Sequence, residues 1–313
     1  MTRGHSPADV AHVPRAATPE ARRSTLLPVL LLNLSAAMWG GSFIVAKGLV
    51  ARHDPLSMVD VRFAVAAVVM VALRPRSVLA LPRRTWPRAA ALGLVYGVAQ
   101  ALHYTALETT PASTAGFLIG TFLVVTPVLA LVWLGRRSAP LTWAGVALGM
   151  VGLAVLSWHN SSFGLGEVLC LVAAVLYAAQ IVGLGAWSVP GETWGLTAVQ
   201  LGCIAVVLAV PATLRGWDPP SSGRDWLAIG YLAVVGGVIA VSIQTWAQAR
   251  LHSAHAAVIM AAEPLWVAVF AVLLTPERLT VRLVVGGLLL LAANMVTAVG
   301  QRRRLRRPGR QPV

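Results

Sequence analysis

Residues 165–187 read LGEVLCLVAAVLYAAQIVGLGAW, an apolar run with a single charged side chain, Glu167. A transmembrane helix needs roughly 20 consecutive apolar residues to cross the ~30 Å hydrocarbon core of a bilayer. This run meets that requirement, and similar runs precede and follow it along the chain. We therefore expect residues 165–187 to form a transmembrane helix within a membrane protein.

The composition of the whole chain agrees with this run. Of the 313 residues, 57% are hydrophobic and 12% are charged, and the mean hydropathy is +0.74. Soluble domains carry about 25% charged residues. A water-soluble fold of this size would leave much of its apolar surface exposed to solvent, so the lipid bilayer is the first expected partner.

Apolar stretches bounded by charged and turn residues predict ten transmembrane helices. Their ranges are Leu26–Val50, Leu56–Leu73, Ala89–Leu107, Ala112–Leu134, Leu141–Trp158, Leu165–Trp187, Trp194–Leu214, Trp226–Ala249, Ala254–Leu274 and Val281–Gly300. The expected fold is therefore an all-α membrane protein.

Arginine is distributed unequally between the two sides of this arrangement. With ten helices both tails share a side, which collects eighteen basic residues, against four in the opposite loops, at Arg52, Arg215, Arg224 and Arg278. The positive-inside rule places both termini in the cytoplasm and the protein in the cytoplasmic membrane. The net charge of +14 lies in loops and tails, without a basic domain interleaved with aromatic residues, so nucleic acid is not an expected partner.

Two polar tails flank the helices. Residues 1–25 include Pro7, Pro14 and Pro19, and we expect a disordered cytoplasmic tail there. Residues 301–313 are rich in arginine and are expected to form a basic cytoplasmic tail.

The chain also repeats itself at an offset of about 140 residues. Ala115–Leu118 falls over Ala256–Ile259 at this offset. The two halves, residues 26–158 and 165–300, then hold five helices each. An odd number of helices per half places the halves antiparallel in the bilayer, which is the architecture of many secondary transporters.

Short motifs in both halves match those of a known family. They are Trp39–Phe43 with Lys47, Pro55 with Arg62, Ala106–Leu107 before Ala112–Phe117, Leu176–Ala178, Ala262–Pro264, and Glu277–Leu279 before Gly286–Gly287. With these motifs the chain resembles the EamA-domain family of the drug/metabolite transporter superfamily over residues 26–301. The resemblance implies ten transmembrane helices in two inverted five-helix EamA repeats, with helices 1, 3, 4, 6, 8 and 9 around a central cavity. The sequence departs from the family at Arg136–Arg137, where a Gly-Glu pair is common.

Glu263 is the acidic residue nearest the centre of an expected helix. It precedes Pro264, whose missing amide proton leaves a backbone carbonyl without its helical partner. A carboxyl group inside the membrane must be neutral or find a donor, because an unpaired charge there costs several kcal/mol. Glu263 is therefore a candidate for proton coupling, and the alternative is a carboxyl group that only packs against a neighbouring helix.

The third expected helix carries a polar and aromatic face. Tyr96, Gln100, His103 and Tyr104 follow the spacing i, i+4, i+7 and i+8, which places them on one side of a helix. Polar side chains inside a membrane protein face the bundle interior. This face is the best candidate for a cavity wall, although hydrogen bonds between helices use the same side chains.

Further candidates for the substrate pathway lie on three other helices. They are Ser35, Trp39 and Ser42 in helix 1, Tyr177 and Gln180 in helix 6, and Gln244, Trp246 and Gln248 in helix 8. Gln244 falls over His103 at the repeat offset. Two cations, Lys47 and Arg62, are interpreted as structural because long basic side chains near helix ends extend to the interface.

The sequence favours a secondary transporter, not an enzyme, that moves a small metabolite, an amino-acid-like solute or a drug, with export as the expected direction. No cofactor is expected, and Glu263 leaves open coupling to a proton gradient. The alternative is a membrane-embedded enzyme, such as an intramembrane protease or a lipid-modifying transferase. The sequence has no His-Glu-x-x-His metal motif, Gly40–Phe43 lacks the glycine that follows a nucleophilic serine, and Glu263 has no centred acidic partner. Substrate identity, coupling ion and oligomeric state stay open.

Overall fold

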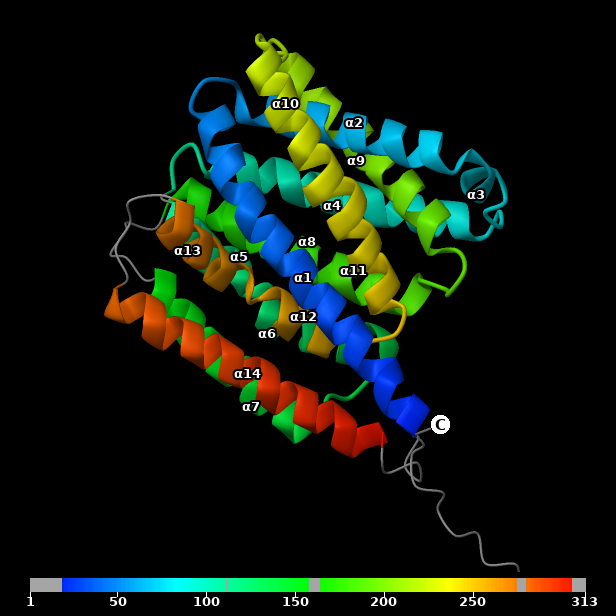
Figure 1. Ribbon diagram of the computed structural model, residues 1–313, viewed down its shortest axis with the longest axis vertical. Coiled ribbons are helices and arrows are strands. Elements are labelled where there is room, and N and C mark those ends of the chain that lie inside the picture. The colour runs from blue at the N-terminus through cyan, green and yellow to red at the C-terminus, as the bar shows by residue number, and fades with distance from the viewer. Residues whose placement is uncertain (1–18, 111, 158–163, 275–279, 306–313) are drawn as a thin grey trace, which may run out of the picture.

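The computed structural model describes residues 19–110, 112–157, 164–274 and 280–305, and within them the regular structure is helical (Figure 1). The helices are α1 Pro19–Val50, α2 Pro55–Leu73, α3 Pro75–Leu79, α4 Thr85–Ala106, α5 Ala112–Gly120, α6 Phe122–Leu134, α7 Pro140–Ser157, α8 Leu165–Trp187, α9 Thr193–Leu214, α10 Gly223–Tyr231, η1 Leu232–Ile239, α11 Ala240–Gln248, α12 Ser253–Met260, α13 Glu263–Leu274 and α14 Val281–Leu305. The expectations for residues 1–18 and 306–313 and for the Glu277–Leu279 motif lie outside the described residues.

Each of the ten expected ranges holds a helix or consecutive helices. Seven of these segments are long and apolar enough to cross a membrane, and the apolar parts of α7 and α14 are shorter. One expectation is wrong, because α1 begins at Pro19 and residues 19–25 are helical, not a disordered tail. α14 likewise continues to Leu305, into the expected C-terminal tail.

Local sequence signals explain several helix ends. The Asp54 carboxylate caps α2 by accepting a hydrogen bond from the Ser57 backbone N–H at 2.8 Å, and Pro55 occupies the first helical position, where no amide proton is needed. At the other end of a helix, Gly135 adopts a left-handed conformation with φ of 63° and ends α6.

Two helix pairs are broken at positions that the sequence repeat superimposes. In the first half, α5 ends at Gly120 and α6 begins at Phe122; in the second, α12 ends at Met260 and α13 begins at Glu263. Pro264 contributes to the second break because it cannot donate a hydrogen bond to the Met260 carbonyl. Broken helices at corresponding positions of two inverted halves typically mark the binding site of a secondary transporter.

The helix between residues 223 and 248 has a different irregularity. Between α10 and α11 the backbone forms a π-helical segment, η1. A π-helix is rare and usually limited to a single turn. The corresponding helix of the first half, α4, is continuous, so the two halves are not equivalent at this position.

Helix packing joins α4 to two helices of the second half. It contacts α8 and α9, α2 packs on α9, and α7 and α14 form a separate pair at one edge (Figure 1). The start of α1 and the end of α14 lie at the same end of the bundle. α4 approaches α9 closely because of Gly93, where an added Cβ atom would lie 2.6 Å from the Gln200 carbonyl oxygen.

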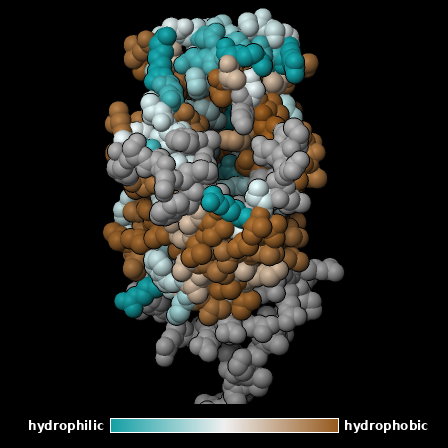
Figure 2. Space-filling view, turned by 90° about the vertical axis from the view of Figure 1, so that its left-hand side faces the viewer, coloured by the Kyte–Doolittle hydropathy of each residue, from teal (hydrophilic) through white to brown (hydrophobic). Residues whose placement is uncertain are grey.

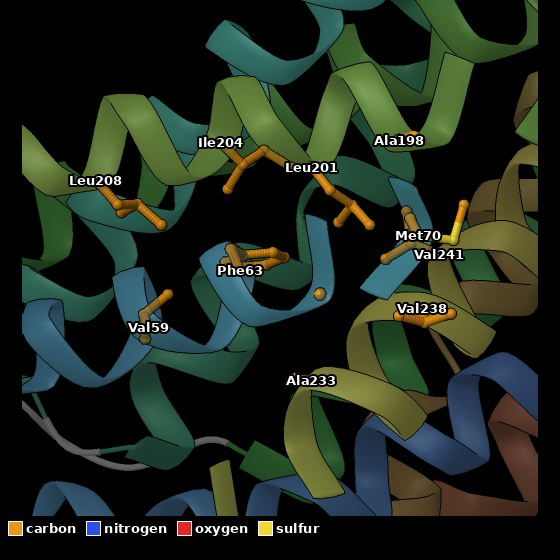
Figure 3. Packing of buried hydrophobic residues seen from close by; sticks show 11 residues of the cluster. Val59, Phe63, Met70, Ala198, Leu201, Ile204, Leu208, Ala233, Val238 and Val241 are labelled. Carbon is orange, nitrogen blue, oxygen red and sulfur yellow. The ribbon is translucent and has the colours of Figure 1, made fainter. Parts of the chain in front are cut away.

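The largest core cluster lies between α2, α9 and the segment around η1. Phe63 and Met70 of α2 face Leu201 and Ile204 of α9 (Figure 3). The outside of the bundle is also apolar, with leucine and valine side chains such as Leu227 78% exposed. Figure 2 shows hydrophobic residues over the flank of the molecule and hydrophilic residues gathered at one end. An apolar core with an apolar exterior is the arrangement expected of a protein surrounded by lipid.

Candidate substrate site

The site is built around the face of α4 that the sequence singled out. The Tyr96 ring packs edge-on against the Tyr177 ring of α8, with centroids 5.4 Å apart. His103 Nδ1 lies 3.3 Å from the Tyr177 hydroxyl, within hydrogen-bond distance, and the Tyr104 ring lies 5.5 Å from the His103 ring. Tyr177 therefore joins the α4 face to α8 and forms an aromatic cluster, Tyr96, His103, Tyr104 and Tyr177.

Gln100 belongs to the same α4 face and is buried. Its side chain lies beside the Tyr96 hydroxyl. The four α4 residues predicted from helical spacing therefore share one face in the structure, and three of them form the aromatic cluster with Tyr177.

Glu263 is the first residue of α13, directly after the break between α12 and α13. It interacts electrostatically with Tyr96 and Tyr177 of the aromatic cluster. The carboxyl group thus lies where a broken helix meets the cluster. This position suits a group that binds a proton or a substrate, because helix ends carry backbone groups without intrahelical partners.

Arg62 was expected to extend to the membrane interface, and this expectation is wrong. Arg62 is 8% exposed, and its Nε atom is buried with no hydrogen-bond partner in the described ranges of the chain. The guanidinium group lies 4.6 Å from the centre of the Phe63 ring and interacts electrostatically with Glu263. Arg62 therefore belongs to the site. The side chain of Lys47 lies outside the described residues.

Three glutamines form a buried amide cluster beside the aromatic cluster. Gln180 lies one turn after Tyr177 on α8, and Gln244 Nε2 donates to its Oε1 atom at 3.5 Å. Gln248 Nε2 donates to the Met260 sulfur at 3.3 Å. Each of these glutamines keeps one amide atom that is buried without a partner among the described residues. The cluster offers both donors and acceptors to a polar group.

The predicted face of α1 packs against the π-helical region. Ser35 Oγ donates to the Ala240 carbonyl at 2.8 Å and Trp39 Nε1 donates to the Gly236 carbonyl at 2.9 Å. Ser42 is buried nearby. The donors of Ser35 and Trp39 therefore hold the backbone of the neighbouring helix, which is the interhelical role that the sequence left open.

The structure does not bring Trp246 to the site. Its ring stacks under the Arg250 guanidinium at 4.0 Å and packs beside the Leu32 and Leu251 cluster. Trp246 lies on the opposite side of its helix from Gln244 because two residues along a helix are about 200° apart. The prediction of a cavity role for Trp246 is wrong in this conformation.

Tyr96, His103, Tyr104 and Glu263 are partly exposed, whereas Gln100 and Tyr177 are buried. A cavity of about 10 Å³ lies beside Arg62 and Tyr104, which is room for about one water molecule. A larger pocket of about 330 Å³ opens elsewhere, between α2 and the Trp217 and Trp226 side chains, and its lining is mostly apolar.

Comparison with known proteins places this arrangement in a family. The sequence profile of the EamA-like transporter family matches residues 26–158 and 164–299, one match in each half. This chain belongs to the EamA-like transporter family. The two matches correspond to two copies of the same unit, as the repeat and the paired helix breaks indicate.

Relatives of this EamA protein carry the names of transporters. An "Uncharacterized transporter" of Archaeoglobus fulgidus is 27% identical over 86% of this chain and 84% of its own length. The "Uncharacterized inner membrane transporter YedA" of Escherichia coli K12 is 28% identical over 66% of this chain and 69% of its own length. A solved structure titled "Crystal structure of protein" covers 90% of this chain and 99% of its own, with a TM-score of 0.73 at 20% identity, which shows a shared fold. The chain is thus a multi-pass membrane protein of a transporter family.

Proposed function

We propose that this protein is a secondary transporter that moves a small metabolite or amino-acid-like solute across the cytoplasmic membrane by alternating access, in the direction of export. The observation that carries the proposal is the pair of helix breaks, α5/α6 and α12/α13, at corresponding positions of the two halves. Glu263 begins the helix after the second break and interacts electrostatically with Tyr96 and Tyr177 of the aromatic cluster, which supports the proposal. Family membership supports transport as the activity.

The mechanism follows from the geometry of the site. The two halves move relative to each other, and the helix breaks allow half-helices to change their angle without breaking further hydrogen bonds. The aromatic cluster contacts the apolar part of the solute, and the amide cluster binds a polar group. Glu263 takes up a proton from one side of the membrane and releases it to the other, which couples solute movement to a proton gradient.

Solute exchange in proteoliposomes tests this proposal. Vesicles containing the purified protein are loaded with one unlabelled compound from a panel of amino acids, aromatic metabolites and amphipathic drugs. Uptake of the same labelled compound is then measured by counterflow. We expect at least one compound to exchange faster than in protein-free vesicles. Exchange of none of them would contradict the proposal.

The proposal includes ten membrane crossings with both termini in the cytoplasm. A background protein is first made without cysteine, by replacing Cys170 and Cys203 with alanine. Into it a single cysteine is introduced at Arg136 or at Ser221, so that its labelling reports on which side of the membrane that loop lies. An impermeant maleimide should label Ser221→Cys in intact cells and Arg136→Cys only after permeabilisation, since the two loops lie on opposite sides. Labelling of Arg136→Cys in intact cells would contradict the orientation.

A further inference from the structure

Arg62 is a buried cation that the transport mechanism above does not use. It lies on α2, roughly 10 Å from the start of that helix at 1.5 Å per residue. Its side chain is more than nine-tenths buried, and the Nε donor has no acceptor among the residues that the structure describes. A guanidinium group presents five donors and stays charged. Within the part of the chain that the structure describes, this cation forms no ion pair, and its Nε donor is unpaired.

The surroundings of Arg62 are aromatic. Phe63 lies under the guanidinium, and Tyr104 lines the same small cavity. Tyr96 and Tyr177 interact with it electrostatically. Arg62 thus extends the aromatic cluster towards α2 and adds a positive charge at one edge of it.

Glu263 carries a charge opposite to that of Arg62 when its carboxyl group is ionised. The two groups interact electrostatically, but among the described residues they do not come within the 4.0 Å of an ion pair. A charge at the centre of a membrane helix costs on the order of 2.5 to 3.5 kcal/mol on insertion scales. Retaining Arg62 without a direct counter-ion is unfavourable for the empty protein. A ligand that supplies an anion would offset this cost.

We propose that Arg62 is the anion-binding residue of the transport site, and that the solute carries a carboxylate attached to an apolar or aromatic body. The carboxylate accepts two parallel hydrogen bonds from the planar guanidinium, and the body packs on Tyr96, Tyr104 and Tyr177. This inference rests on the proposed transport function and narrows its substrate class. Lysine would bind the same charge through one flexible ammonium group, without the paired geometry.

Matched pairs of carboxylates and amides test the inference. The probes are 3-phenylpropionate with 3-phenylpropanamide and indole-3-acetate with indole-3-acetamide, measured by counterflow in proteoliposomes at equal pH. Charge-assisted hydrogen bonds contribute about 1.5 to 3 kcal/mol, or roughly ten- to a hundredfold in affinity. We expect wild type to exchange the carboxylates at least tenfold faster than the amides.

Variants locate this preference at Arg62. Arg62→Gln should reduce the carboxylate-to-amide ratio at least tenfold, and Arg62→Lys should retain part of it. Arg282→Gln removes the same group from an exposed position of α14 and should leave the ratio unchanged. If Arg62→Gln does not fold, the inference is tested by the carboxylate-to-amide ratios of wild type and of Arg62→Lys. A wild-type protein that exchanges the amides as fast as the carboxylates overturns the inference and leaves transport intact, whereas exchange of no compound in either panel overturns both.

Discussion

Tyr177 links the polar face of α4 to the second half of the protein. Its ring packs on Tyr96 and its hydroxyl lies within hydrogen-bond distance of His103. Because these contacts join helices from different halves, the side chains on this face respond to any relative movement of the halves.

Shortening this face should impair transport more than folding. We expect Tyr96→Ala, Gln100→Ala and Tyr104→Ala each to reduce exchange by about tenfold, or ~1.4 kcal/mol of lost binding, with a smaller loss of folded protein. Counterflow rates, normalised to the monodisperse protein recovered in detergent, measure this. Tyr231→Ala, at a half-exposed position of α10, is the matched control and should change neither quantity. If yield and rate fall in proportion in all three variants, the α4 face is only packing.

Helical spacing predicted which four side chains of α4 share a face, because the helical repeat alone determines this. Periodicity does not decide what that side faces. Arg62 was therefore assigned to the interface from its distance to the helix end, although a charge within an apolar run also signalled the site. Trp246 was assigned to the cavity only because it is adjacent to predicted residues. The sequence did not single out Gln200, which is fully buried and whose two amide atoms have no partner among the described residues.

At the scale of elements, the close approach of α4 and α9 depends on glycine. A Cβ atom at Gly93 would lie 2.6 Å from both the Gln200 carbonyl oxygen and the Cys203 Cβ atom. The Gln200 carbonyl belongs to the backbone of α9, so it cannot rotate away from the added atom as a side chain could. The two helices would have to separate, which disturbs the packing of the bundle interior.

Gly93→Ala should therefore destabilise the protein. Overpacking of this kind costs about 1 to 3 kcal/mol, and we expect a lower midpoint of thermal unfolding in detergent. Gly202→Ala on α9 is the matched control, because an added Cβ atom there meets nothing within 4 Å. That control should be neutral or slightly stabilising, since alanine is the better helix former. Equal midpoints for Gly93→Ala and wild type would show that α4 and α9 are not held at this distance.

The positions of the helices followed from hydropathy, but their irregularities did not. An apolar run shows only that a segment crosses the membrane, and Pro264 was the one local sign of the break before α13. The break at Thr121 has no comparable sign, because Pro127 lies within continuous α6. The π-helical segment depends on contacts from α1, through Trp39 and Ser35, that are distant in sequence.

At the scale of the molecule, a polar network joins loops from the two halves at the end opposite the termini. His53, between α1 and α2, lies 3.0 Å from an Asp218 carboxylate oxygen and 3.2 Å from one of Asp225. Arg52 forms an ion pair with Asp225 at 2.6 Å, and the Asp54 backbone N–H donates to Asp218. The network fixes the α1–α2 loop to the start of α10.

This network should make stability depend on pH. Burial lowers the pKa of His53, but hydrogen bonds and charges from Asp225 and Asp218 outweigh burial and raise it above its usual value. A raised pKa in the folded state stabilises the protein below the unfolded pKa of about 6.5, and this stabilisation is lost as pH rises through the folded pKa. We expect the unfolding midpoint of wild type to fall over this range more than that of His53→Gln. Arg224→Gln, at an exposed neighbour, should behave like wild type, and identical pH profiles for wild type and His53→Gln would refute the assignment.

The most direct test of the account is accumulation of an exchanged solute in proteoliposomes under an imposed pH gradient, for wild type and Glu263→Gln. The substitution keeps the volume and much of the hydrogen bonding of the carboxyl group but removes its titration. We predict that wild type concentrates the solute, and that Glu263→Gln folds, exchanges solute at equal pH and no longer concentrates it. Gradient-driven accumulation by Glu263→Gln equal to that of wild type, or none by wild type above protein-free vesicles, would contradict the account.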